Sequence, residues 1–473
     1  MTPREDTGGG RRRGYARQQV VVVGGGRAGL AAVEELRRQA FEGDIVVLHD
    51  ESTPPYDRPA CAKGVLTGHK RVRDTLLPVH AGDTVQWRLG RRAVGLDPDE
   101  HVVYTDTGER FGYDALVVAT GAAPVPPRGW PMTEPGMHML YRLSDAWALR
   151  QELCTARRVA VVGAGLTGCE VAHAVRTLAR ECVLIDPGPQ ALVRPLGEQV
   201  GRLVTREIAR DGVHLRLGRR VTSIVRSRRG WVLALDDGDE VVADVVVATT
   251  GERPDTGWLQ GIPGLDTSDG VLCDEALHVV GIPDVVAAGT AARWPNLRYG
   301  ATPTRVGQWI TALEQGRAAA RTLMVGAGYA APFTHVPRFW SDQFGLRIQV
   351  CGVLPADAEI TVTEQRPGRR DMARAGVAVG YRVDGELVGL VAVNAPQAFT
   401  AITRTMLASA APRFPAPARP GPDSGPLDLP VALAPTASGD RGGRRSVASL
   451  PVPGGPPPIS GPVPLRPRLY AVT

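Results

Sequence analysis

The chain has 473 residues, 43% of them hydrophobic, and a formal net charge of +6. This length can build two or three hydrophobic cores, so we expect several domains. The positive charge does not indicate a nucleic-acid-binding fold, because it lies at the two ends: residues 1–17 hold five arginines against two acids, and residues 411–473 hold seven against three.

Membrane insertion and metal binding are also not expected. No stretch reaches the roughly 18–20 uninterrupted apolar residues of a membrane span. No apolar signal core precedes the first predicted strand, and the six cysteines are scattered without a CxxC pair or zinc spacing. We therefore predict a cytoplasmic protein without a structural metal.

The first predicted elements follow a leader, residues 1–17, that we expect to be disordered. A strand at Val20–Val23, a helix at Leu30–Gln39 and a strand at Ile45–Leu48 come in close succession. Residues 85–120 alternate like a small β-meander and end in an apolar run. This order is typical of the start of a doubly wound α/β domain.

The same order returns in the middle of the chain. Its predicted elements are a strand at Val159–Val162, a helix at Thr167–Arg180, a strand at Cys182–Asp186 and a helix at Glu198–Asp211. The apolar run Asp244–Gly251 repeats the pattern of Asp114–Gly121. An internal repeat of this kind predicts two related, Rossmann-like α/β domains.

Beyond the repeat we expect a buried strand at Val285–Gly289, an amphipathic helix at Arg305–Met324 and a smaller α+β domain. After residue 410 the composition changes, and sixteen of the 40 prolines lie between Pro412 and Pro467. Such a segment buries too little apolar surface to fold. The predicted division is 18–129 with 252–329 for one dinucleotide domain, 130–251 for the other, 330–410 for the α+β domain, and 411–473 for a disordered tail.

Two glycine-rich motifs lie 139 residues apart, each between a predicted strand and a predicted helix. Their glycines are Gly24, Gly26 and Gly29 in the first copy, and Gly163, Gly165 and Gly168 in the second. In this pattern the glycines permit a tight turn, close approach of a pyrophosphate and close packing of helix on strand. The phosphate then lies at the helix N-terminus, where free N–H groups favour an anion.

An acidic residue about 20 positions after each motif is expected to bind an adenosine ribose. The candidates are Glu51 and Asp186. Asp186 would repel a 2′-phosphate and no arginine follows it directly, so the pattern favours NADH over NADPH. Two dinucleotide sites in one chain indicate electron transfer between two cofactors.

Six further segments appear in the order known from one family. They are PYDRP at Pro55–Pro59 followed by Lys63, ATGAAP at Ala119–Pro124, VVGAGLTGCE at Val161–Glu170, GERPDTGWL at Gly251–Leu259, RVGQWITALEQGRAAA at Arg305–Ala320 and RFWSDQFGLRIQ at Arg338–Gln349. Over residues 18–410 the chain therefore resembles the FAD-dependent NADH:ferredoxin reductases, which serve ring-hydroxylating dioxygenases and cytochrome monooxygenases and include rubredoxin and putidaredoxin reductases.

The resemblance implies a flavoprotein that takes a hydride from NADH onto FAD and passes single electrons to a ferredoxin-type iron–sulfur protein. FAD would bind at the first motif with Glu51, and Arg58 and Lys63 would line the flavin. Glu170 would reach the nicotinamide carboxamide and could pair with Lys63, while Trp309 would cover the flavin. The remaining cofactor-binding positions are Val94, Thr120, Gly121, Arg194, Gly251, Gly289 and Thr290.

The chain departs from the family pattern at several positions. Thr290 replaces an aspartate, which would weaken FAD binding because a charge-assisted hydrogen bond is lost. Gly307 replaces a glutamate, and Cys61 and Ala62 replace leucine and serine. We expect Trp340 in the core of the third domain.

Two alternative functions remain open at this point. Cys61 lies where a redox thiolate would make the protein an NADH oxidase or disulfide reductase. Thr290 and the proline-rich tail would also suit an NADH-binding interaction protein that has lost redox activity. The oligomeric state cannot be read from the sequence.

Overall fold

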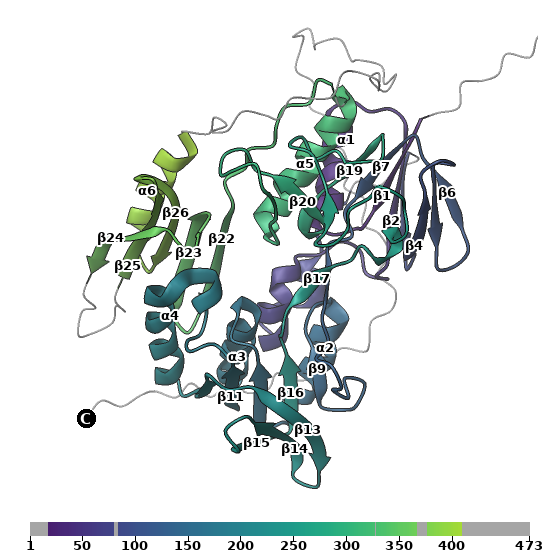
Figure 1. Cartoon of the computed structure of the whole chain (residues 1–473). Coiled ribbons are helices and arrows are strands. Elements are labelled where there is room, and N and C mark those ends of the chain that lie inside the picture. The colour runs from purple at the N-terminus through teal and green to yellow at the C-terminus, as the bar shows by residue number, and fades with distance from the viewer. Residues whose placement is uncertain (1–17, 80–83, 327, 367–375, 409–473) are drawn as a thin grey trace, which may run out of the picture.

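The computed structural model describes residues 18–79, 84–326, 328–366 and 376–408 (Figure 1). The predicted leader and the predicted tail lie outside these residues. Two five-stranded parallel sheets and a five-stranded antiparallel sheet are the largest sheets of the described part, so the predicted fold class is confirmed. Within the described residues, no helix is long and apolar enough to cross a membrane.

The first sheet has five parallel strands in the order β19–β7–β1–β2–β3. These are β1 (Gln19–Val23), β2 (Asp44–His49), β3 (Val85–Leu89), β7 (Ala115–Val118) and β19 (Val285–Ala287). Helices α1 (Arg27–Arg38) and α5 (Trp309–Val325) pack against each other over this sheet. The strands are near-continuous apolar runs because a parallel sheet with covered faces is buried on both sides.

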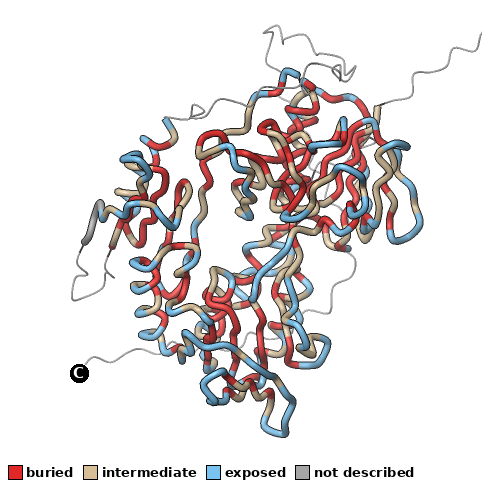
Figure 2. The backbone as a smooth tube through the Cα atoms, viewed as in Figure 1, coloured by how far each residue is buried: buried red, intermediate tan, exposed pale blue. Residues whose placement is uncertain are grey.

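The second sheet repeats this plan, with five parallel strands in the order β12–β11–β10–β16–β9. These are β9 (Met137–Met139), β10 (Arg158–Val162), β11 (Glu181–Asp186), β12 (His214–Leu217) and β16 (Val245–Ala248). Its helices are α2 (Leu143–Leu153), α3 (Leu166–Thr177) and α4 (Val193–Arg210). The predicted internal repeat is therefore present, and buried residues concentrate along the strands of both sheets (Figure 2).

Each parallel sheet is accompanied by a three-stranded antiparallel sheet. One contains β4 (Ala93–Asp97), β5 (Val102–Thr105) and β6 (Arg110–Gly112), and the other contains β13 (Val221–Ser227), β14 (Gly230–Leu235) and β15 (Glu240–Ala243). The meander predicted over residues 85–120 therefore begins later, because Val85–Leu89 joins the parallel sheet as β3. The paired strands β8 (Ala122–Pro124) and β17 (Glu252–Pro254) connect the two halves. A further small sheet holds β18 (Val271–Leu272), β20 (Ala292–Pro295) and β21 (Pro303–Arg305).

The C-terminal sheet is antiparallel, in the order β22–β23–β26–β25–β24. It comprises β22 (Arg338–Gln343), β23 (Leu346–Gly352), β24 (Glu359–Arg366), β25 (Gly376–Val383) and β26 (Glu386–Val393), with α6 (Pro396–Ala408) against it. Five short helical turns complete the chain: Arg58–Ala60, Cys61–Val65, Val72–Thr75, Gly257–Leu259 and Gly289–Ala291.

The segment that follows β2 packs away from its own sheet. Tyr56 and Leu66 are buried in one hydrophobic cluster with Leu149 of α2, Phe344 beside β22 and Val393 of β26. One core therefore joins this segment to elements of the second sheet and of the C-terminal sheet. This packing carries residues 56–66 to the second sheet, where the site described below is formed.

An ionic contact fastens α1 to α5. Glu35 of α1 is 2% exposed, and its Oε1 lies 3.1 Å from Nη1 of Arg321 in α5. Burial alone would raise the pKa of Glu35, but hydrogen bonds from Arg38, Gln39 and Arg321 lower it to about 2. The carboxylate is therefore stabilised in its charged form.

Candidate functional site

The two glycine motifs adopt the same turn at the carboxyl end of their first strands. Gly24 and Gly163 both have φ of 112°, which favours glycine. A Cβ on Gly24 would lie 2.2 Å from the carbonyl oxygen of Ala119, and one on Gly163 would lie 2.4 Å from that of Thr249. The third glycines, Gly29 and Gly168, are equally tight, with their Cβ positions 1.9 and 1.8 Å from the carbonyl oxygen of the first glycine.

The second glycine of each motif faces open space instead. A Cβ on Gly26 or on Gly165 would meet none of the described atoms within 4 Å. These glycines precede α1 and α3, and neither helix N-terminus is capped by a side chain. An open cradle beside uncapped helical N–H groups fits a pyrophosphate, so both turns pass this structural test for a bound dinucleotide.

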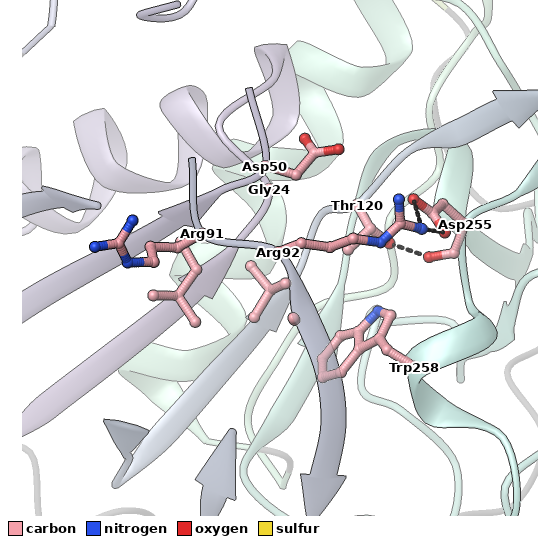
Figure 3. Close-up of a pocket in the computed structure, with 10 residues that line it drawn as sticks. Gly24, Asp50, Arg91, Arg92, Thr120, Asp255 and Trp258 are labelled. Atoms are coloured by element: carbon pink, nitrogen blue, oxygen red, sulfur yellow. Dashed lines mark hydrogen bonds and ion pairs between the residues drawn. The ribbon is translucent and has the colours of Figure 1, made fainter. Parts of the chain in front are cut away.

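A small pocket opens beside the first motif (Figure 3). Asp50, Arg92, Thr120, Asp255 and Trp258 are among the residues that line it. Nη2 of Arg92 lies 3.3 Å from Oδ1 of Asp255, and the hydroxyl of Thr120 donates to the carbonyl oxygen of Asp255 at 2.6 Å. The buried indole Nε1 of Trp258 has no hydrogen-bond partner among the described residues, so the pocket offers an unsatisfied donor to a polar ligand.

Asp50 and Asp255 line this pocket, whereas the predicted Glu51 does not. Glu51 is buried, and its carboxylate accepts hydrogen bonds from Tyr56 at 2.9 Å and Arg58 at 2.8 Å. Arg58 also donates to the carbonyl oxygen of Tyr141 at 2.9 Å and stacks on its ring at 4.5 Å. Glu51 therefore holds Arg58 in this structure, whereas the Asp50 carboxylate at the pocket pairs with Arg142.

Lys63 and Glu170 come together although 107 positions separate them in sequence. Nζ of Lys63 lies 3.1 Å from Oε1 of Glu170, as the resemblance led us to expect. Lys63 sits in the kinked turn Cys61–Val65, where its φ of −121° and ψ of −105° are not helical. Glu170 lies in the second turn of α3, beyond the turn formed by Gly165. The pair therefore joins the loop that follows the first motif to the helix that follows the second.

Asp186 lies at the end of β11, as predicted. Its Oδ2 accepts from the backbone N–H of Ala164 and its Oδ1 from that of Gly188, both at 2.7 Å. Nη2 of Arg194 is 3.9 Å from the same carboxylate, and the Arg194 side chain is largely exposed. Asp186 thus stabilises the glycine turn with its own hydrogen bonds, and the exposed Arg194 lies beside it.

Thr290 and Trp309 lie near the start of α5. A Cβ on Gly307 would meet Oε1 of Glu252 at 3.1 Å and the methyl of Thr290 at 3.3 Å, so these three residues are neighbours. Trp309 stacks under the guanidinium of Arg27 at 5.3 Å, and its buried Nε1 has no hydrogen-bond partner among the described residues. Trp309 therefore carries a second unsatisfied indole donor, next to the helix that follows the first motif.

The remaining predicted positions lie around the same openings. Gly121 has φ of 72°, and its nearest neighbour is the hydroxyl of Tyr141 at 3.4 Å from its Cβ position. Gly251 has φ of 127° and open space around its Cβ position, and Gly289 donates its backbone N–H to Gln315 at 2.9 Å. Val94 is exposed on β4, next to two residues that line the pocket.

Cys61 does not have the environment of a reactive thiolate. Its side chain is 3% exposed, and burial raises the pKa of its thiol to about 12. The thiol is therefore protonated at neutral pH and screened from solvent. The other buried cysteines are equally unpaired, and no group of metal ligands occurs among the described residues.

Three residues of the site were missed in the sequence. Asp50 is adjacent to Glu51 in sequence, and only the orientation of the strand end shows which of the two side chains lines the pocket. Ser341 donates to Oε1 of Glu170 at 2.5 Å from a different sheet. Trp258 shows no pattern other than its position in GERPDTGWL. Trp340, which we expected in the core, is 47% exposed because β22 turns the neighbouring Ser341 inward, so that prediction was wrong.

Comparison with known proteins agrees with this geometry. Residues 18–316 match the family model described as pyridine nucleotide-disulphide oxidoreductase, and residues 338–421 match the reductase C-terminal model. The chain is 33% identical over 385 residues to the biphenyl dioxygenase system ferredoxin–NAD(+) reductase component of Paraburkholderia xenovorans (strain LB400), covering 80% of this chain and 90% of the relative.

Two solved structures are similar over most of their length. The crystal structure of Fdr9 has a TM-score of 0.72 and 33% identity, covering 84% of this chain and 96% of that one. The covalent putidaredoxin reductase–putidaredoxin complex has a TM-score of 0.75 and 25% identity, covering 83% and 93%.

Proposed function

Because the chain belongs to the pyridine nucleotide-disulphide oxidoreductase family, we propose that it is an FAD-dependent reductase that oxidises NADH and reduces a ferredoxin-type iron–sulfur protein. The observation that carries the proposal is the ion pair between Lys63 and Glu170, 3.1 Å apart. It brings together one residue from the loop beyond the first dinucleotide motif and one from the helix beyond the second. A site between two dinucleotides is what direct transfer between them requires.

FAD at the first motif would supply the chemistry, because a flavin accepts a hydride and releases electrons one at a time. Gly26 and the N-terminus of α1 would hold its pyrophosphate, and Glu51, with Asp50 beside it at the pocket, would bind its ribose. Lys63 places a cation at the junction, where it stabilises negative charge. The indole of Trp309, packed on Arg27, would keep water from the same place.

NADH would bind at the second motif. Gly165 and the N-terminus of α3 would receive its pyrophosphate, with Asp186 at the ribose and Arg194 near the phosphates. Lys63 and Ser341 both approach Oε1 of the Glu170 carboxylate. Among the described residues no hydrogen bond reaches Oε2, so this oxygen can accept an N–H from the nicotinamide carboxamide.

The relatives act with ferredoxins, as their names state, and this supports a ferredoxin as the electron acceptor here. We also propose the division into 18–129 with 252–329 for FAD, 130–251 for NADH and 330–410 for the C-terminal domain. A cytoplasmic location is a further proposal. It rests on the scattered cysteines, and cell fractionation would test it.

An anaerobic titration of the purified FAD-loaded protein with NADH, followed by visible absorbance, tests the proposal. We expect complete bleaching of the flavin by one equivalent of NADH, and then reduction of an added [2Fe–2S] ferredoxin. A yellow protein that NADH does not bleach would contradict the proposal and favour the redox-inactive alternative. Rapid oxygen consumption that Cys61→Ser abolishes would favour the oxidase instead, although the buried, protonated thiol argues against that outcome.

A further inference from the structure

The C-terminal sheet supplies a buried hydroxyl to the junction of the two dinucleotide sites. Oγ of Ser341, on β22, donates to Oε1 of Glu170 at 2.5 Å. Ser341 is 1% exposed and the Glu170 side chain 13%, so the bond is largely buried. A hydrogen bond to an ionised carboxylate in such surroundings is short and stronger than one between neutral groups.

Gln343 fixes the direction of that hydroxyl. Its Nε2 donates to Oγ of Ser341 at 3.1 Å, and Gln343 is also 1% exposed. Because the Ser341 oxygen accepts from Gln343, its own hydrogen is directed toward Glu170. The donors therefore run in one direction, from Gln343 to Ser341 to Glu170.

The hairpin that carries these residues is fastened to α3. The turn between β22 and β23 consists of Phe344 and Gly345, whose φ values of 50° and 65° fit a two-residue turn of type I′. The backbone N–H of Phe344 donates to Nδ1 of His173 at 3.2 Å, and the two rings lie 5.0 Å apart. His173 is three residues beyond Glu170 on α3, so the hairpin tip is held next to the carboxylate it contacts.

We propose that Ser341 is a positioning residue: with Gln343 behind it, it fixes Oε1 of Glu170 against Lys63 and so aims Oε2 at the nicotinamide carboxamide. The inference rests on the proposed function, in which Glu170 accepts that N–H. It assigns the C-terminal sheet a part in pyridine-nucleotide recognition, through a residue that touches neither substrate nor flavin. A carboxylate held at one oxygen cannot rotate freely, which favours a single orientation of the bound carboxamide.

The test compares two dinucleotides that differ only at the carboxamide of the nicotinamide ring. Calorimetry on the oxidised, FAD-loaded protein measures the Kd of NAD+ and of 3-acetylpyridine adenine dinucleotide, in which a methyl ketone replaces the carboxamide and no N–H can donate. We expect the native protein to prefer NAD+ by about 10-fold, the value of one well-placed hydrogen bond to a charged group. In Ser341→Ala this preference should fall to about threefold or less, with the weakening confined to NAD+.

Two further variants separate positioning from structural damage. Ser341→Thr keeps the hydroxyl and should keep the preference. Asp342→Asn changes the next residue on the outer face of β22, where Asp342 makes an exposed ion pair with Arg347, and should also keep it. If Ser341→Ala does not retain FAD, Ser341→Cys, which keeps the size and weakens the donor, replaces it in the comparison.

The outcomes distinguish the role of Ser341 from the role of Glu170. If the native protein prefers NAD+ and Ser341→Ala prefers it equally, the role of Glu170 stands and the role of Ser341 is refuted. If the native protein does not distinguish the two dinucleotides, the contact between Glu170 and the carboxamide is absent, and both are refuted. A stopped-flow measurement of flavin reduction by NADH should show the same order, with Ser341→Ala slower by about 10-fold and Asp342→Asn unchanged.

Discussion

Alanine substitutions in the glycine motifs should separate cofactor binding from folding. Gly165 has φ of −76° and ψ of −173°, a conformation that alanine adopts readily, and its Cβ position is open. Gly163, two residues earlier, has φ of 112°, and its Cβ would lie 2.4 Å from the carbonyl oxygen of Thr249. An alanine is therefore sterically tolerated at position 165 and excluded at position 163.

For Gly165→Ala we expect the free energy of unfolding to change by less than about 1 kcal/mol, because the weaker N-cap is offset by the smaller entropy of the unfolded chain. The new methyl group instead fills the space proposed for the pyrophosphate. Overpacking of a fitted site costs about 1–3 kcal/mol, which corresponds to a roughly 5- to 150-fold higher Kd for NADH. FAD content should not change, because Gly165 belongs to the second motif.

Gly163→Ala should unfold the second sheet more easily. A positive φ costs an alanine about 1–2 kcal/mol, and the clash with the Thr249 carbonyl adds about as much. We expect a loss of at least about 2 kcal/mol, seen as a lower melting temperature. Gly26→Ala is the matched control in the first motif, since its Cβ position is equally open, and it should lower FAD retention while leaving stability of the FAD-free protein intact.

Thermal unfolding followed by circular dichroism, FAD absorbance and calorimetry of NAD+ binding measure the three quantities on each variant. The reasoning is wrong if Gly165→Ala binds the nucleotide as tightly as the native protein, because the open space would then not hold the pyrophosphate. It is equally wrong if Gly165→Ala loses FAD and Gly26→Ala loses the nucleotide.

Three further outcomes follow from the described contacts. Cys61→Ser should leave the rates of NADH oxidation and of ferredoxin reduction within about twofold of native, because burial raises the pKa of the thiol to about 12 and keeps it protonated. A large loss of either rate in a steady-state assay would instead support the thiolate mechanism. The pKa of Glu35 is lowered to about 2, so its contribution to the free energy of unfolding is complete above about pH 4.5 and is lost as the pH falls toward 2. Allowing for the partial exposure of Arg38 and Arg321, Glu35→Gln should lower the free energy of unfolding by about 2 kcal/mol in a denaturant titration at pH 6, and by less at pH 3. An equal loss at both pH values would contradict this prediction. Thr290→Asp should restore an acid beside the flavin site and tighten FAD binding about 10-fold in fluorescence titrations, with unchanged affinity counting against the assignment.

The glycine motifs, the order of strands and helices and the internal repeat could all be predicted, because they depend on local chemistry. A positive φ at Gly24 and Gly163, apolar runs in buried strands and a helix that follows each turn are written within about 30 residues of sequence. The resemblance added Lys63 and Glu170, whose roles stay proposals. These local features do not depend on how the sheets pack against one another.

The sequence could not show which side of a strand end faces a pocket, or which distant residues meet. Asp50 and Glu51 are adjacent and equally acidic, yet one lines the pocket and the other holds Arg58. Ser341 reaches Glu170 across 171 positions because its strand turns alternate side chains inward and the hairpin tip packs on α3. These contacts depend on the core that packs the second sheet and the C-terminal sheet together, and no local sequence pattern encodes contacts over that distance.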